Sequence, residues 1–307
     1  MFSVHRTILL AITTSVLLLP AWAEPVTLPG TSISVDVPVG FEVSRTFSGL
    51  QNMATGASFL FAELPANAKT QLTDVFGSLA KASAVFEPQG VTLREEIRLD
   101  TDRTGIAAYR GTQTVGDLEF RKWVSLFVKD NVLIVSYQAP PPGDDETLII
   151  ATFESIRIGA PLTLEEQVDA LPYSFGSIGE MRIVGVLAGS GTILTIGDLD
   201  TDPENSQPFL IVAPSLGDSG LAGNDPIAYS KALLNQAATL TIDRYLDEKE
   251  VIVVGWPGYR LEALGTHTAT GKKLHIAQWI GYSEHGYFRI IAQSPVELWE
   301  SALPHFE

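Results

Sequence analysis

The chain has 307 residues, of which 45% are hydrophobic and 18% charged, and it contains no cysteine. The absence of cysteine excludes disulfides, thiolate catalysis, cysteine-ligated zinc and a cysteine-linked lipid. The 36 acidic residues outnumber the 20 basic ones, which gives a formal net charge of −16. Such a surface repels phosphate backbones and anionic membranes at long range. We therefore expect a globular protein that binds no nucleic acid.

Residues 1–23 predict a cleavable secretory signal peptide. Arg6 supplies a positive charge, residues 8–19 form an apolar core, and residues 21–23 give an Ala-Trp-Ala cleavage site. A core of about a dozen residues is shorter than the roughly 20 that span a membrane. No later segment reaches that length without a charge, glycine or proline, so we expect no membrane span in the mature chain. The prediction is a periplasmic or secreted protein, cleaved near Ala23, with a net charge of −17 because Arg6 is removed.

Hydrophobic patterns predict the secondary structure of residues 24–158. Residues 33–37 alternate apolar and polar side chains, as expected of a half-buried strand. Leu72, Phe76 and Leu79 recur at three- and four-residue steps and predict a helix over 69–86 with one apolar face. Further strands are expected at 57–62, 92–99, 105–114, 118–128 and 132–137, and a closing helix at 144–155.

The same order of elements is expected in residues 159–307. The predicted strands lie at 181–186, 193–196, 209–213, 251–254, 259–267, 272–283 and 287–293, and the predicted helices at 226–240 and 295–303. An antiparallel meander with helices packed across it is an α+β arrangement. We therefore expect two tandem copies of an antiparallel sheet flanked by helices.

An internal repeat with a spacing of roughly 150 residues underlies this order. The matched segments are 58–65 with 208–215, 105–110 with 255–260, 132–140 with 287–295, and the Phe-Glu pairs at 153–154 and 306–307. Because four matched segments keep their order, we predict a first α+β repeat at 24–158 and a second at 159–307. The Gly-Ala-Pro sequence at 159–161 marks the boundary.

Two features of the first copy resemble the PsbP-like family. The sequence ISVDVPVGFEV at 33–43 ends a strand in Pro-x-Gly-Phe, and the Tyr-Arg strand at 105–114 leads into a hairpin and a terminal helix. The family includes the extrinsic photosystem subunit P and exported bacterial proteins of the DcrB type. The resemblance implies an α/β/α sandwich and a binding or assembly role, with no shared catalytic residues. The second copy departs at 174–180, which lack the Pro-x-Gly-aromatic ending.

Residues 217–220 read Gly-Asp-Ser-Gly, a sequence similar to that around the nucleophile of trypsin-like proteases. That chemistry needs a histidine base, but every histidine beyond residue 23 follows Ser219, which is the wrong order for that fold. These histidines are His267, His275, His285 and His305. We interpret the segment as a loop, and keep as an alternative a periplasmic serine hydrolase that uses Ser219 with one of the first three histidines.

A dense acidic cluster follows the strand predicted at 193–196, and its members are Asp198, Asp200, Asp202 and Glu204. Carboxylates in a turn can bind Ca²⁺ through hard oxygen ligands. The EF-hand pattern fails, however, because Pro203 replaces its glycine and Phe209 its final glutamate. We expect a solvated acidic loop, with a calcium-dependent structural module as the alternative. A weaker zinc candidate is His267 with His275, if a hairpin at 269–272 places the two face to face.

Two Tyr-Arg pairs recur between the copies and give a candidate surface for an envelope protein or a small ligand. Adjacent residues on a strand face opposite sides of the sheet, so one member of each pair is expected to pack under a helix and the other to lie on the open face. The predicted aromatic, arginine-bearing surface consists of Tyr109, Arg110, Trp123, Tyr259, Arg260 and Trp279. In the alternative, each tyrosine completes the core and each arginine pairs with a carboxylate. Without a catalytic signature, we expect a cofactor-free, non-enzymatic binding or assembly protein of the bacterial cell envelope.

Overall fold

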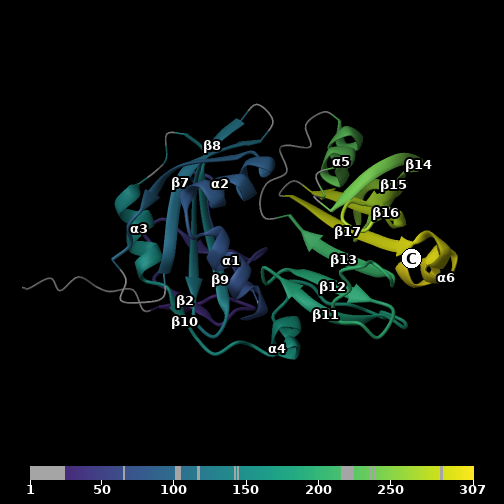
Figure 1. Ribbon diagram of the computed structural model, residues 1–307, viewed down its shortest axis with the longest axis horizontal. Helices are drawn as coiled ribbons and strands as arrows, with labels where there is room; N and C mark the ends of the chain where they lie inside the picture. The colour runs from purple at the N-terminus through teal and green to yellow at the C-terminus, as the bar shows by residue number, and fades with distance from the viewer. Residues whose placement is uncertain are drawn as a thin grey trace, which may run out of the picture.

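The computed structural model describes residues 25–307, apart from residues 65, 101–104, 116–117, 142, 144, 216–224, 236, 238 and 284–285. The predicted signal peptide and Ser219 lie outside the described residues. Three antiparallel sheets, with helices packed on the larger two, confirm the predicted α+β fold (Figure 1). Within the described part of the chain, no helix has the length and apolar character needed to cross a membrane.

The first large sheet has seven strands in the order β3-β4-β5-β9-β8-β7-β6. Its strands are β3 (Glu42–Val43), β4 (Gly49–Asn52), β5 (Ala57–Leu64), β6 (Val91–Ile97), β7 (Gly105–Val115), β8 (Leu118–Val128) and β9 (Val132–Ala139). The strand predicted at 118–128 coincides with β8. The strand predicted at 33–37 is β2 (Ile33–Val35), which joins β1 (Val26–Thr27) and β10 (Arg157–Ile158) in a separate small sheet.

The second large sheet repeats this order, position by position, as β11-β12-β13-β17-β16-β15-β14. Its strands are β11 (Arg182–Leu187), β12 (Gly191–Thr195), β13 (Phe209–Pro214), β14 (Leu240–Val253), β15 (Trp256–His267), β16 (Lys273–Ser283) and β17 (Gly286–Pro295). The segments matched in the sequence lie at equivalent places, on β5 and β13, β7 and β15, and β9 and β17. The division into repeats at residues 158 and 159 stays a prediction.

Helices cover both faces of each large sheet (Figure 1). On the first sheet, α1 (Lys69–Val75) and α2 (Leu79–Phe86) pack on one face and α3 (Glu146–Glu154) on the other. On the second sheet, α5 (Pro226–Asn235) and α6 (Trp299–Phe306) take the corresponding places. The remaining helices are α4 (Leu164–Asp169) and the 3₁₀ turns η1 (Ala66–Ala68), η2 (Glu87–Gln89) and η4 (Val296–Leu298).

The single helix predicted at 69–86 is wrong, because the chain breaks it into α1 and α2. Phe76 ends α1, Gly77 follows, and the Ser78 hydroxyl accepts a hydrogen bond from the Lys81 amide over 3.3 Å as the N-cap of α2. A serine cap satisfies an amide that the first helical turn leaves free. The apolar face continues across the break, so periodicity alone did not reveal it.

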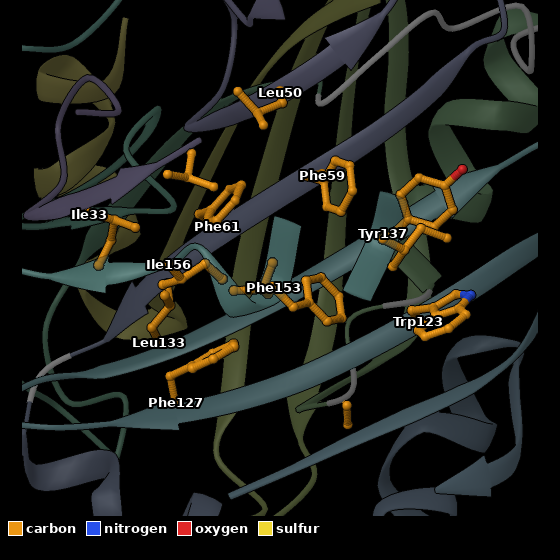
Figure 2. Packing of buried hydrophobic residues seen from close by; sticks show 14 of the residues in the cluster. Ile33, Leu50, Phe59, Phe61, Trp123, Phe127, Leu133, Tyr137, Phe153 and Ile156 are labelled. Atoms are coloured by element: carbon orange, nitrogen blue, oxygen red, sulfur yellow. The ribbon is translucent and has the colours of Figure 1, made fainter. Parts of the chain in front are cut away.

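Large aromatic side chains form the core between the first sheet and α3. Figure 2 shows Phe153 of α3 among Phe59, Trp123 and Phe127 of the sheet. The Phe153 ring lies 6.0 Å from Phe59 and 6.4 Å from Trp123 in edge-on geometry, which aromatic rings prefer. Full burial of each such side chain stabilises the fold by about 1.5–3 kcal/mol. This packing includes Ala108 of β7, the strand that carries Tyr109 and Arg110.

The edge of the second sheet differs most from the predicted secondary structure. The helix predicted at 226–240 ends at Asn235, and the strand predicted at 251–254 is the last part of β14, which spans 14 residues. Among the described residues β14 pairs with β15 alone, and nine of its 14 side chains are exposed, six of them charged. An edge strand therefore lacks the alternation that signals a half-buried strand.

Candidate functional site

Tyr109 on β7 and Tyr259 on β15 occupy equivalent positions in the two sheets. Each lies directly opposite a glutamate on the edge strand, Glu96 for Tyr109 and Glu250 for Tyr259. In both repeats the next residue is an arginine that pairs across the sheet with a tryptophan. The two tyrosines can therefore be compared directly.

Tyr109 is closed off by the helical layer. Its side chain is 1% exposed, and its hydroxyl donates a hydrogen bond of 2.7 Å to the Phe76 carbonyl oxygen. The ring also lies 6.0 Å from the Phe76 ring. Burial raises the pKa of Tyr109, and the negative charge of Glu96 adds to that rise. Tyr109 thus completes the core of the first repeat.

Each arginine of the Tyr-Arg pairs stacks on the tryptophan beside it. The Arg110 guanidinium lies 5.7 Å from the Trp123 ring centre, and that of Arg260 lies 5.4 Å from Trp279. Arg110 donates to Glu95 over 2.8 Å and to Glu146 over 2.6 Å, and these hydrogen bonds raise the pKa of Arg110. In each sheet the stacked arginine and tryptophan lie on the face opposite to that of the neighbouring tyrosine.

The arginine of the second repeat belongs to a buried network. Arg260 lies 2.7 Å from Glu262, whose other carboxylate oxygen lies 2.6 Å from His275 Nε2. The His275 ring stacks on Trp299 of α6 at 3.9 Å. Among the described residues, the buried Arg260 Nε has no hydrogen-bond partner. This network joins the sheet to α6.

The zinc candidate of His267 facing His275 is wrong. His275 lies opposite Leu264 across the β15–β16 pair, whereas His267 lies at the end of β15 and bonds to the Thr270 hydroxyl at 2.8 Å. Leu264 and His267 are three residues apart on one strand, so the two imidazoles point to opposite faces of the sheet. His285 lies outside the described residues.

Tyr259, in contrast to Tyr109, borders an open cavity of about 660 Å³, a volume typical of ligand sites. We call this cavity the hairpin pocket, because it lies beside the turn that joins β14 to β15. It is lined by Pro226, Glu250, Val251, Ile252, Pro257, Gly258, Tyr259 and Tyr282. The turn itself holds Val254 at φ +51° and Gly255 at φ +84°. A β-branched residue is strained at positive φ, so Val254 is held at the tip against its own preference.

The polar groups of the hairpin pocket differ in how they are bonded. The Tyr282 hydroxyl donates to the Pro226 carbonyl oxygen over 3.0 Å and lies 2.7 Å from the Ser230 hydroxyl. Burial raises the pKa of Tyr282. Neither the Tyr259 hydroxyl nor the exposed Glu250 carboxylate has a hydrogen-bond or ionic partner within the described ranges. These two groups are therefore available to a ligand.

A tyrosine cluster beneath the N-terminal part of α5 supports the pocket. The ring centres of Tyr229, Tyr282 and Tyr287 lie 6.0 to 6.4 Å apart, and burial raises the pKa of Tyr229 strongly. Arg289 donates to the Gln278 side-chain oxygen over 2.7 Å and to the Leu233 carbonyl over 3.1 Å. Burial lowers the pKa of Arg289. These contacts hold Tyr282 in place at the pocket wall.

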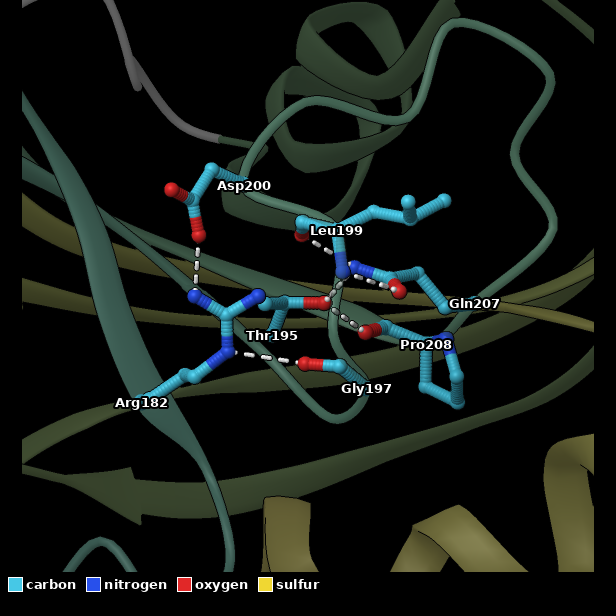
Figure 3. Close-up of polar contacts among 7 residues, drawn as sticks. All are labelled: Arg182, Thr195, Gly197, Leu199, Asp200, Gln207 and Pro208. Atoms are coloured by element: carbon cyan, nitrogen blue, oxygen red, sulfur yellow. Dashed lines mark hydrogen bonds and ion pairs between the residues drawn. The ribbon is translucent and has the colours of Figure 1, made fainter.

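The acidic loop after β12 is held by hydrogen bonds within the protein (Figure 3). Asp200 forms an ion pair with Arg182, which also donates to the Gly197 carbonyl over 2.8 Å. Asp202 accepts from the Ser206 hydroxyl over 2.9 Å and from the Gln207 amide over 2.8 Å. In the described part of the chain, no group of three or more His, Asp and Glu side chains is placed to hold a metal ion. The solvated loop stays the prediction for Asp198, Asp200, Asp202 and Glu204, and calcium binding stays its untested alternative.

The structure separates the six residues of the predicted surface. It brings Arg110 against Trp123 and Arg260 against Trp279, but on two different sheets and under the C-terminal helix of each repeat. Of the six, Tyr259 is the residue that borders the hairpin pocket. Glu250 and Pro257 were missed, because their positions depend on the pairing of β14 with β15 and their proximity to Pro226 on the packing of α5. That these residues contact a ligand or partner stays a prediction.

No protein-family model matches the sequence, and no curated protein matches it. Among solved structures, PA94, a Pseudomonas aeruginosa protein of unknown function, aligns with 41% of this chain and 92% of its own, at 14% identity and a TM-score of 0.27. The T6SS immunity protein TplEi of Pseudomonas aeruginosa aligns over 89% of this chain and 88% of its own, at 9% identity and a TM-score of 0.23. A chain of the Tle4–Tli4 complex aligns over 88% and 85%, at 9% identity and a TM-score of 0.22. At these TM-scores none of the likenesses supports an inference about fold or function.

Proposed function

We propose that this chain is an exported, non-enzymatic binding or assembly protein of the bacterial cell envelope, and that it binds its partner at the hairpin pocket. In this proposal two PsbP-like repeats, at 24–158 and 159–307, form the folded body. One observation carries it: Phe76 seals Tyr109 in the first repeat, whereas the equivalent Tyr259 borders an open cavity in the second. One copy of the duplicated unit is closed and the other is open to a ligand.

The surface around the pocket supports the same proposal. Ile252 is 71% exposed, Val254 is 64% exposed and Trp256 is 37% exposed. Exposed apolar groups gathered at one place and bordered by polar residues mark interaction sites. The first repeat has the polar sequence Arg-Leu-Asp-Thr-Asp-Arg-Thr at 98–104, between β6 and β7. The apolar tip thus belongs to the repeat that carries the pocket.

The hydrolase alternative pairs Ser219, which lies outside the described residues, with a histidine base, and the described bonds of His267 and His275 each use one ring nitrogen. His267 is bonded to Thr270, and His275 is bonded to Glu262 and stacked on Trp299. A base that activates a serine needs a free ring nitrogen within hydrogen-bond reach of the hydroxyl. A fluorophosphonate probe tests the alternative directly, because labelling at Ser219 would establish it.

Photocrosslinking in the native host tests the proposal. A benzophenone amino acid replaces Ile252 at the rim of the pocket in a chain made with its signal peptide. A matched control carries the same amino acid at Met53, which is 74% exposed in the first repeat. We expect a discrete adduct from position 252, none from position 53, and a mature N-terminus at Glu24. The absence of an adduct at 252, in an exported chain with an unchanged melting temperature, would refute the proposal.

A further inference from the structure

We infer that the hairpin pocket receives the guanidinium or ammonium group of an arginine or lysine side chain, carried by an extended segment of a partner protein. The inference rests on the proposed function and assigns the chemistry of its partner. It draws on the unbalanced charge of the pocket, on how this chain binds its own cations, and on the free edge of β14.

The charge of the pocket is unbalanced at one residue. β14 carries four carboxylates, and three of them have a cation beside them: Asp243 has Lys273 at 2.8 Å, Asp247 has Arg260 at 3.7 Å, and Glu248 has Lys231 at 2.5 Å. The fourth, Glu250, has no cation within ion-pair distance among the described residues. Its neighbour Lys249 points to the other face of the strand. Glu250 is thus the carboxylate of β14 left to a ligand.

The chain repeatedly binds its own cations between a ring and a carboxylate. Lys231 lies 5.2 Å from the Tyr245 ring and pairs with Glu248. Arg110 likewise stacks on Trp123 and pairs with Glu95. Arg260 stacks on Trp279 and pairs with Glu262. The negative face of an aromatic ring attracts a cation, and it does so more strongly as water is excluded.

The hairpin pocket holds an aromatic ring and a carboxylate, as these three sites do, but no cation among the described residues. Tyr259 and Glu250 lie directly opposite each other on β15 and β14, so their side chains share one face of the sheet. Tyr282 lines the same cavity and adds a second ring. A positive side chain that entered the cavity would find an aromatic face and a free carboxylate together. The net charge of −16 favours the approach of such a basic partner.

The outer edge of β14 indicates that the cation belongs to an extended protein segment. β14 is the last strand of its sheet, so no strand of the described residues neighbours its outer amide and carbonyl groups. The pairing of β14 with β15 is irregular between Ile242 and Arg244 and between Tyr245 and Asp247, but regular from Asp247 to Val253. Bulges protect an edge from further pairing, so the regular stretch is the part open to an added strand. A segment paired there would direct alternate side chains toward the pocket and cover Ile252.

The test combines the crosslinker at Ile252 with changes of the nearby carboxylates. Glu250→Gln removes the charge and keeps the shape of the side chain. Glu96→Gln is the matched control, because Glu96 holds the same position opposite the closed Tyr109. We expect Glu250→Gln to reduce the adduct about tenfold and Glu96→Gln to leave it unchanged. Tyr259→Phe should retain the adduct, since it keeps the ring, and Tyr259→Leu should reduce it.

Mass spectrometry of the crosslinked peptide completes the test. We expect an arginine or lysine of the partner within about two residues of the crosslink, as strand alternation requires. An adduct that Glu250→Gln leaves undiminished would overturn the cation assignment and leave the proposed function standing. An adduct of twice the mass of the chain would assign the pocket to a second copy and also overturn the inference. If the chain with the crosslinker at position 252 and no other substitution gave no adduct, the proposed function would instead be refuted.

Discussion

The Tyr109 hydroxyl donates a hydrogen bond of 2.7 Å to the backbone carbonyl oxygen of Phe76, the residue that ends α1. This bond joins the first sheet to its helical layer and satisfies a carbonyl at the end of a helix, where carbonyls lack a partner within the helix. In the described part of the second repeat, Tyr259 has no corresponding acceptor. The difference in bonding accompanies the difference between a closed core and an open pocket.

The first prediction compares two matched substitutions that each remove one hydroxyl. Tyr109→Phe leaves the buried Phe76 carbonyl without its donor, so we expect the free energy of unfolding to fall by about 1–2 kcal/mol. Tyr259→Phe removes a hydroxyl without a partner, and we expect a change within about 0.5 kcal/mol. Urea unfolding followed by circular dichroism measures both values. Equal losses would show that Tyr259 is bonded as Tyr109 is.

Strands with one buried face could be predicted from the sequence because their side chains alternate or run continuously apolar. β8 and β9 lie inside the first sheet, and their predicted starts agree with the structure. β14 could not be predicted in full, because an edge strand exposes charged side chains on both faces. The break at Gly77 was missed since the apolar side chains continue across it, although the Ser78 cap was a readable signal.

The candidate site was less accessible to sequence reasoning than the fold. The repeated Tyr-Arg pair directed attention to Tyr259, but it gave no reason to separate Tyr259 from Tyr109. That distinction depends on the tertiary contact with Phe76. Glu250 became a candidate only when the strand register placed it opposite Tyr259 and its neighbours on β14 were seen to be paired. Residues far apart in sequence meet through pairing that the local pattern does not encode.

The second prediction concerns the buried network of Arg260. Glu262→Gln removes its nearest negative charge, and the other carboxylates of the described residues near Arg260 lie at 3.7 Å and 3.9 Å, from Asp247 and Glu307. Because a buried guanidinium without a close counter-charge is costly, we expect unfolding free energy to fall by about 3 kcal/mol. Glu95→Gln in the first repeat is the control, since Glu95 is 53% exposed and Arg110 keeps Glu146. Its expected cost is below about 1 kcal/mol. Thermal and urea unfolding measure both, and similar losses would contradict the buried role of Arg260.

The third prediction is a pH dependence set by Lys122 on β8. Burial lowers the pKa of Lys122 from 10.5 to about 8, and its ammonium bonds only to the Gln138 side-chain oxygen, at 3.3 Å, within the described residues. Between pH 8 and 10.5 the unfolded chain therefore binds a proton that the folded chain does not. Stability rises with pH wherever the unfolded state binds more protons. We expect the buried Lys122 ammonium to lower the free energy of unfolding by about 1–3 kcal/mol below pH 8. This loss should decrease as the pH rises above 8.

Lys122→Met isolates this contribution from other titrating groups, including the tyrosines whose pKa values are raised. The substitution keeps most of the apolar stem and removes the charge. We expect it to stabilise the protein at pH 7 and to stabilise it less at pH 9.5, as measured by urea unfolding at both values. Parallel pH profiles for the two proteins would show that Lys122 is not desolvated in the fold.

The last prediction concerns the acidic loop and its response to calcium. Arg182 already neutralises Asp200, and Asp202 accepts hydrogen bonds from Ser206 and Gln207. We therefore expect neither excess calcium nor a chelator to move the melting temperature by more than about 1 °C. Asp202→Ala should lower the unfolding free energy by about 1 kcal/mol, because it leaves backbone amides without their acceptor. Asp198→Ala, at an exposed position of the same loop, is the control with little expected effect. A melting temperature that rises with calcium, and loses that rise in Asp202→Ala, would establish the calcium-dependent module instead, since a ligand that binds only the folded state must stabilise it.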